Sequence, residues 1–310
     1  MSDLVSLALS AYKLIALQKD AVMPKGNSIH LGLNRVDPSR YAGWDGVLKA
    51  CEADAVDMKN IAEREGFRSK VLLTSDATRS AVWAELADSA SVLHAGDILL
   101  LTYSGHGGQL PDRDGDEPDS MDETWCLYDG QVLDDEINEL LGRFEKGVRL
   151  LVVSDSCHSG SVARASLVTQ FSQARVAIAG RFRELVSSED SVVFRSMPAD
   201  VARSVYQANK DFYDGILSSP SLSGAKDRVK ASGILLSGCQ DNQLSQDGVF
   251  NGAFTSHLKA VWRDGAFVGD YEAFHRMIVH SMNRTPEQTP QLSFVGDISA
   301  SFLRQRPFTV

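Results

Sequence analysis

The sequence predicts an α/β fold with a mostly parallel central sheet and helices on both of its faces. Two segments, residues 98–103 and 148–153, are apolar at nearly every position, whereas a strand with one face in water would alternate. Stretches of helical character occur at 44–65 and 78–94, before the first of these strands. Because strands alternate with helices along the chain, we expect the strands to pair in parallel and to be buried on both faces.

Further elements continue this alternation. Two shorter strands are predicted at 28–33 and 71–73, one before each of the two helices. A strand at 233–237 restores the pattern later in the chain, and serine, proline and glycine at 218–224 indicate an exposed loop before it. The helices expected in this second half are at 175–185, 199–210, 252–263 and 270–282.

One large domain is expected, because 310 residues with 43% hydrophobic content can bury one large core. An N-terminal helical extension is predicted for residues 1–26, followed by a region at 27–160 that holds the chemically informative motifs. Residues 161–230 carry more basic than acidic side chains and form a loop or helical insertion, a candidate processing or lid segment. Residues 231–310 are expected to complete the same domain.

The charge balance limits the class of partner. The net charge of −10, from 31 basic and 41 acidic residues, argues against nucleic acid and anionic membranes and favours a cationic partner or metal ion. No stretch reaches the roughly 18 consecutive apolar residues of a membrane span. The first 23 residues are apolar but lack the basic start and cleavage-like end of a signal peptide, so we interpret them as an amphipathic helix docked on the core.

The cysteines indicate a reducing compartment. The four of them are widely spaced and show neither metal-ligand spacing nor the density of a disulfide scaffold. We therefore expect a cytoplasmic monomer that binds neither nucleic acid nor membranes.

Two short motifs follow the two long strands. Residues 103–108 read Tyr-Ser-Gly-His-Gly-Gly, and residues 155–160 read Asp-Ser-Cys-His-Ser-Gly. In parallel sheets, ligands bind beyond the carboxyl ends of the strands, and His106 and Cys157 both lie just past such an end. A thiol and an imidazole at one edge are the minimum equipment for covalent cysteine catalysis.

The pattern predicts a role for each residue. Cys157 is the candidate nucleophile, and His106 is the base that accepts the thiol proton and later protonates the leaving amine. The backbone amides of Gly107 and Cys157 are the candidate donors to a developing oxyanion. Taken singly, a core cysteine and a hydrogen-bonded turn histidine would be the simpler interpretation. Together, in these glycine-containing motifs, they favour catalysis.

Both motifs resemble those of metacaspases and their prokaryotic relatives, the orthocaspases, within the caspase-like cysteine peptidases. Cys157 follows His106 by 51 positions, which agrees with the spacing of about 50 in caspases. The motif around Cys157 departs from true caspases, whose signature begins Gln-Ala-Cys. The resemblance covers roughly residues 28–295. It implies a caspase-like fold and an endopeptidase that cuts after Arg or Lys through an acyl-enzyme, with protein or peptide substrates.

A carboxylate at Asp54 interrupts the apolar face of the first predicted helix. Val47, Cys51, Met58 and Ile61 share that face. Asp54 must therefore either pair with a group inside the protein or bind a ligand. Asp155, two residues before Cys157, raises the same question. By the resemblance, Asp54, Ser104 and Asp155 form the pocket that selects Arg or Lys, which we call the S1 pocket. The alternatives are that Asp54 pairs with a core arginine and that Asp155 only stabilises the strand end.

Calcium is a second expectation. Residues 112–123 hold seven carboxylates, which suit calcium, but Glu117 stands where an EF-hand loop needs glycine. By the resemblance, Asp122, Asp134 and Asp135 match an activating calcium site. The fourth matching position is Arg164, which would repel the ion. We therefore expect no required cofactor, with calcium as an optional activator, and a solvated acidic loop is the alternative.

Self-cleavage is also expected, because an acidic pocket would accept the chain's own basic residues. The candidates in the 161–230 segment are Arg164, Arg175, Arg181, Arg183, Lys210, Lys226, Arg228 and Lys230. The rival hypothesis is a catalytically silent protein of the same fold that acts as a calcium-responsive binding or scaffold protein.

Overall fold

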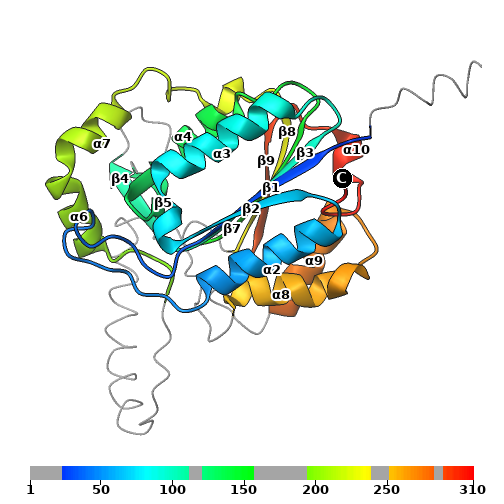
Figure 1. Ribbon diagram of the computed structural model, residues 1–310, viewed down its shortest axis with the longest axis horizontal. Coiled ribbons are helices and arrows are strands. Elements are labelled where there is room, and N and C mark those ends of the chain that lie inside the picture. Colours follow the sequence, from blue (N-terminus) through cyan, green and yellow to red (C-terminus); the bar gives the residue numbers. More distant parts are fainter. Residues whose placement is uncertain (1–22, 112–120, 157–193, 239–250, 283–288) are drawn as a thin grey trace, which may run out of the picture.

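The computed structural model describes residues 23–111, 121–156, 194–238, 251–282 and 289–310. A six-stranded sheet in the order β2-β1-β3-β7-β8-β9 lies at its centre (Figure 1). All neighbours pair in parallel except β8 and β9, which are antiparallel. The predicted mostly parallel α/β fold is confirmed. The strands are β1 Gly26–Gly32, β2 Arg68–Leu73, β3 Ile98–Ser104, β7 Arg149–Asp155, β8 Ser232–Ser237 and β9 Gln291–Gly296.

Helices cover both faces of this sheet. On one face lie α2 (Cys51–Arg64), α8 (Ala253–Trp262) and α9 (Tyr271–Met282), and on the other lie α3 (Arg79–Val92) and α4 (Asp134–Leu141) (Figure 1). Every residue of β3 and β7 is buried, with Leu99 and Leu101 packed toward α3 and α4 and Leu100 packed toward α8 and α9. This burial on both faces explains why these strands are continuously apolar.

A small antiparallel sheet extends the domain beside the carboxyl end of β3. It consists of β4 (Gly107–Pro111), β5 (Met121–Leu127) and β6 (Gly130–Leu133). Helices α6 (Ala199–Ala208) and α7 (Lys210–Leu217) pack against it around a third apolar cluster, and the short α10 (Ala300–Leu303) lies near the C-terminus. The sequence patterns did not predict this sheet. β8 and β9, from the last part of the chain, belong to the same central sheet as β1, β3 and β7.

Three short 3-10 turns complete the described elements, at Thr74–Asp76, Lys226–Arg228 and Arg263–Gly265. No helix in the described part of the chain is long and apolar enough to span a membrane. The expected N-terminal helix and the expected helix at 175–185 lie outside the described residues.

The first helix begins later than predicted. The sequence pattern indicated a helix from residue 44, but α2 starts at Cys51, and Val47 is 56% exposed. Gly43 and Gly46 have φ values of +92° and +53°, a left-handed backbone that ends helical geometry. Residues 44–50 are therefore a loop, and this loop reaches the candidate active site.

A buried histidine in β1 makes the fold sensitive to acid. His30 is fully buried, and its Nδ1 lies 2.8 Å from Oγ1 of Thr102 in β3. Burial, aided by the nearby Lys59 charge, lowers the pKa of His30 from 6.5 to about 3. The ring stays neutral in the folded protein between these values, whereas the unfolded chain binds a proton. Stability therefore falls as the pH drops from 6.5 toward 3.

Because of His30, we expect the unfolding free energy to fall by about 2 kcal/mol between pH 7 and pH 5. The lower pH is about 1.5 units below the ordinary histidine pKa, and each unit corresponds to about 1.4 kcal/mol. The measurement is the urea unfolding free energy at both pH values for the unchanged chain and for His30→Asn, whose amide reaches the position of Nδ1. The unchanged chain should lose about 2 kcal/mol more than the variant. Equal losses would contradict the assignment.

Candidate active site

His106 lies in the connection between β3 and β4, two residues after the end of β3 and directly before the start of β4. It is buried, and its Nε2 lies 3.0 Å from the carbonyl oxygen of Gly46. Because a carbonyl only accepts, Nε2 must carry the hydrogen, so Nδ1 is the basic nitrogen of the neutral ring. The ring also packs against Trp44, with centroids 4.7 Å apart. The 44–50 loop thus fixes both the tautomer and the orientation of the predicted base.

Gly46 has a structural reason to be glycine. Its φ is +53°, and a Cβ there would lie 2.8 Å from the Trp44 ring and 3.1 Å from Cδ2 of His106. A side chain at this position would displace the two rings. The sequence patterns did not identify Trp44 or Gly46, because residues 44–50 were expected to be helical.

The predicted nucleophile follows β7. This strand ends at Asp155 and pairs in parallel with β3, with Asp155 opposite Ser104. Cys157 is two residues further along and lies outside the described residues. The topology therefore leads from β3 to His106 and from β7 toward Cys157 at the same edge of the sheet, which is the edge where ligands of parallel sheets bind.

Three predicted pocket residues surround one guanidinium group that belongs to the chain itself. Nη2 of Arg195 lies 2.7 Å from Oδ2 of Asp54, and Nη1 lies 3.1 Å from Oδ2 of Asp155. Nη1 also donates to Oγ of Ser104 at 2.7 Å and to the Asp155 carbonyl at 3.1 Å. Arg195 is fully buried. The structure thus brings Asp54, Ser104 and Asp155 together, and Asp54 does pair with a buried arginine, as the alternative interpretation held.

The two carboxylates also accept hydrogen bonds from the start of α8 and from the two residues before it. Asp54 accepts from Nδ2 of Asn251 at 2.8 Å and from the Gly252 amide at 3.0 Å. Asp155 accepts from the amide and the hydroxyl of Thr255, at 3.1 and 2.8 Å. The amides at a helix N-terminus stabilise negative charge. Both carboxylates therefore have hydrogen-bond donors in addition to Arg195.

Opposing effects act on the pKa of Asp54. Burial raises the pKa, the Arg195 charge opposes this rise, and the Asp155 carboxylate adds to it. Two buried carboxylates this close require a cation between them to stay ionised together. The pair is therefore suited to bind a basic side chain and to exclude an acidic one.

The backbone of Arg195 meets the predicted oxyanion donor. The Gly107 amide donates to the Arg195 carbonyl oxygen at 3.0 Å, and the Gly107 carbonyl accepts from the Met197 amide at 2.8 Å. Ser196 thereby forms a parallel bridge with Gly107 at the start of β4. Sequence reasoning missed Arg195. It is one of several basic residues in the 161–230 segment, and no motif marks it.

The predicted calcium residues do not form one cluster. Asp122 in β5 and Asp135 in α4 line a small cavity together with residues 217–220, 222 and 223, whereas Asp134 lines a different cavity with Glu123. Among the described residues, no three Asp, Glu, His or Cys side chains are grouped closely enough to hold a metal ion. Residues 112–120 and Arg164 lie outside this part of the chain. Calcium binding at these residues therefore stays a prediction.

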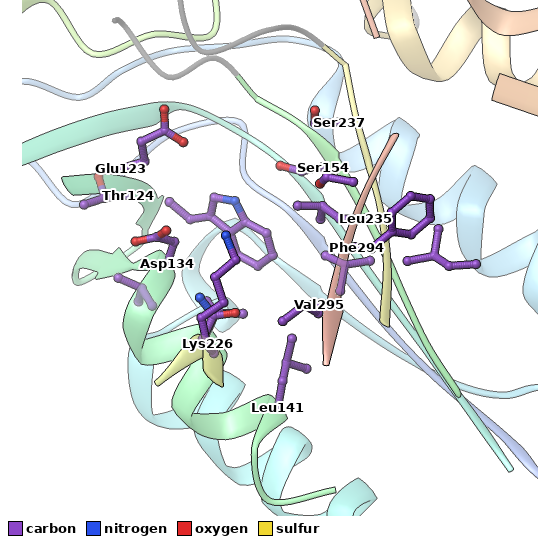
Figure 2. A pocket seen from close by; sticks show the side chains of 17 residues that line it. Glu123, Thr124, Asp134, Leu141, Ser154, Lys226, Leu235, Ser237, Phe294 and Val295 are labelled. Atoms are coloured by element: carbon purple, nitrogen blue, oxygen red, sulfur yellow. The ribbon is translucent and has the colours of Figure 1, made fainter. Parts of the chain in front are cut away.

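The cavity lined by Asp134 lies between α4, the small sheet and strands β7 to β9. Figure 2 shows Glu123 and Asp134 on one wall and Leu235 and Val295 opposite, with Lys226 between them. Ser154 lines this cavity. Because successive residues of a strand point to opposite faces, the cavity lies on the face of β7 opposite to Asp155. This mainly apolar cavity of about 190 Å³ is separate from the acidic site.

Four of the predicted self-cleavage positions lie in the described residues. Lys210 begins α7 and pairs with Asp214, while Lys226 and Arg228 are in a 3-10 turn and Lys230 is in the exposed connection to β8. The other four, Arg164, Arg175, Arg181 and Arg183, lie outside the described residues.

Comparison with known proteins identifies a family and several relatives. A family model described as the caspase domain matches residues 36–297. Metacaspase-1 of Mycosarcoma maydis is 27% identical over 307 residues, covering 91% of this chain and 69% of that protein. Metacaspase-1 of Schizosaccharomyces pombe is 28% identical and covers 87% of this chain and 67% of that protein. A crystal structure of a Geobacter sulfurreducens protein, 49% identical, has a TM-score of 0.79 and covers 93% of this chain and 99% of that one.

Proposed function

Since the chain belongs to the caspase domain family of cysteine peptidases, we propose that it is an endopeptidase that cleaves peptide bonds after Arg or Lys. One observation carries the specificity. A guanidinium group is bound by Asp54, Asp155 and Ser104 beside the ends of β3 and β7. A substrate arginine can take the same position when Arg195 leaves it. Arginine is favoured over lysine because its planar fork can contact two carboxylates at once.

The proposed chemistry uses few groups. Nδ1 of His106 accepts the proton of the Cys157 thiol, and the thiolate attacks the carbonyl carbon of the substrate's basic residue. The Gly107 amide donates to the oxyanion that develops on the carbonyl oxygen. His106 then protonates the leaving amine, and water hydrolyses the thioester.

A panel of peptide amides that differ only at the residue before the cut bond tests the specificity. We expect the highest kcat/KM for arginine, a lower value for lysine, and a loss on the order of 1000-fold for aspartate, because like charges placed together cost several kcal/mol. Citrulline is the matched control, since it keeps the shape of arginine without its charge. Equal rates for arginine and citrulline, or a preference for aspartate, would rule out the acidic pocket as the selector.

Calcium modulation stays a prediction, and the described residues give it no support of their own. The same peptide assay with added calcium and with a chelator measures it. A rate that rises with calcium and falls with the chelator would support calcium modulation, and equal rates would count against it.

A further inference from the structure

We propose that two residues at the start of α8, Gly252 and Thr255, make the S1 pocket select arginine over lysine. This inference rests on the proposed function, and it assigns the choice between the two basic side chains to residues that no sequence motif marks. Asp54 and Asp155 supply the negative charge that attracts either side chain. The start of α8 determines the geometry in which that charge is held.

Thr255 fixes the position of one carboxylate oxygen. Its amide and its hydroxyl both donate to Oδ2 of Asp155, at 3.1 and 2.8 Å. Nη1 of Arg195 lies 3.1 Å from this same oxygen. Thr255 is the third residue of α8, where a backbone amide has no partner within the helix, and its side chain is buried from competing water. The oxygen that meets the guanidinium is therefore oriented by two donors from α8.

A fixed Asp155 matters more for a guanidinium than for an ammonium group. The covalent structure of Arg195 sets the separation of its two Nη atoms, and these atoms meet two different carboxylates, at 2.7 Å for Asp54 and 3.1 Å for Asp155. Both contacts form together only if the two carboxylate oxygens keep a matching separation. A lysine ammonium is a single charged centre on a flexible stem, so it can follow a carboxylate that moves. Rotation of Asp155 therefore weakens the binding of arginine more than that of lysine.

Gly252 supports the same choice from the flat face of the guanidinium. A Cβ at this position would lie 2.5 Å from Nη2 and 2.6 Å from both Nη1 and Cζ of Arg195. Nearly equal distances to these three atoms place the Gly252 backbone over the plane of the group. Its φ of −60° and ψ of 155° suit any residue, so the close approach, and not the backbone conformation, is what requires glycine. The pocket is thus a slot that fits a planar group.

The simpler interpretation is that Asp155 only caps α8. An acceptor for a free amide of the first turn is what a capping side chain provides, and the amide of Thr255 is such a donor. Capping does not account for the Thr255 hydroxyl, which donates to the oxygen that the guanidinium contacts, or for the approach of Gly252 to that group. A capping role predicts a loss of stability with unchanged selectivity, whereas our proposal predicts a change in selectivity.

The test is the ratio of kcat/KM for two peptide amides that differ only in arginine or lysine before the cut bond. Both values come from one enzyme sample, so the ratio cancels the fraction of active molecules and the fraction of pockets that Arg195 fills. Thr255→Val keeps the shape of the side chain without its hydroxyl. The ratio should fall about tenfold, on the scale of one hydrogen bond to a charged group. Thr255→Ser keeps the hydroxyl and should keep the ratio.

Gly252→Ala tests the slot independently of the hydroxyl. The added methyl group should obstruct the guanidinium and leave room for the smaller ammonium, so the ratio should fall at least as far as in Thr255→Val. Thr124→Val is the matched control, because Thr124 is a buried threonine whose hydroxyl donates to Oε1 of Gln131 at 2.7 Å beside the separate apolar cavity. This control should keep the ratio, and urea unfolding of each variant shows that it is folded.

The outcomes separate this inference from the proposed function. A ratio that stays unchanged in Thr255→Val or in Gly252→Ala would overturn the part assigned to that residue, while cleavage after arginine would leave the function standing. An equal fall in Thr255→Ser or Thr124→Val would also overturn the part assigned to Thr255, since lost stability would then explain the effect. If the unchanged chain cleaves neither amide, with or without calcium, the inference and the proposed function fail together.

Discussion

Cys157→Ala and His106→Ala chains are expected to lose at least about 1000-fold in kcat/KM for arginyl peptide amides, because removing either member of a nucleophile and base pair removes covalent catalysis itself. His106 is positioned for this role by the Gly46 carbonyl and the Trp44 ring, which leave Nδ1 as the basic nitrogen. The measurement is the initial rate with an arginyl amide substrate for each purified variant.

Cys126→Ala is the matched control for the thiol. Cys126 is fully buried in β5, and burial raises the pKa of its thiol far above the usual range, so it cannot supply a thiolate near neutral pH. This variant should keep nearly full activity and lose only some stability. If Cys157→Ala kept its activity and Cys126→Ala did not, the assignment of the nucleophile would be wrong.

The sequence patterns predicted the central sheet because its signal is strong and local. β3 and β7 are apolar at almost every position, and burial on both faces demands this wherever helices cover both sides. The small sheet was missed because its strands are short and one of them, β5, begins within the acidic run, whose charges obscure the apolar pattern. The start of α2 was predicted too early because one residue type alone, the glycine at Gly46, indicates in the sequence of residues 44–50 that the backbone turns there.

The acidic site could be predicted in part. Asp54 stood out because a carboxylate on an apolar helix face needs a partner, and Asp155 stood out because of its place before Cys157. The identity of the partner could not be predicted from the sequence. Several basic residues of the 161–230 segment are chemically equivalent at that level. In the structure, Arg195 is distinguished by its ion pairs with Asp54 and Asp155 and by the pairing of Ser196 with Gly107.

The second large effect is expected for Asp54→Asn. This change removes one of the two carboxylates that neutralise the buried Arg195, and a buried charge that loses a partner typically costs 3–5 kcal/mol. Because Asp155 and Ser104 still contact the guanidinium, we expect about 3 kcal/mol, the low end of that range. Activity toward arginyl peptides should fall by a factor on the order of 100 for the same electrostatic reason.

Asp57→Asn is the matched control, because Asp57 lies one turn further along α2, is partly exposed and pairs with Lys259; it accepts from Nδ2 of Asn251, which also donates to Asp54, and this bond can form with an asparagine oxygen as well. Such a pair contributes about 1 kcal/mol or less, so this variant should be close to the unchanged chain in both measurements.

The double variant Asp54→Asn, Arg195→Gln tests whether Asp54 binds the substrate directly or acts only through Arg195. Once the buried cation is gone, the loss of Asp54 should cost much less unfolding free energy, whereas the weak activity on arginyl peptides should remain, since the external arginine still meets only one carboxylate. Urea unfolding and kcat/KM measure both on five chains, namely the unchanged chain, Asp54→Asn, Asp57→Asn, Arg195→Gln and the double variant. If the double variant recovered full arginyl activity, Asp54 would act only through Arg195 and would not bind the substrate.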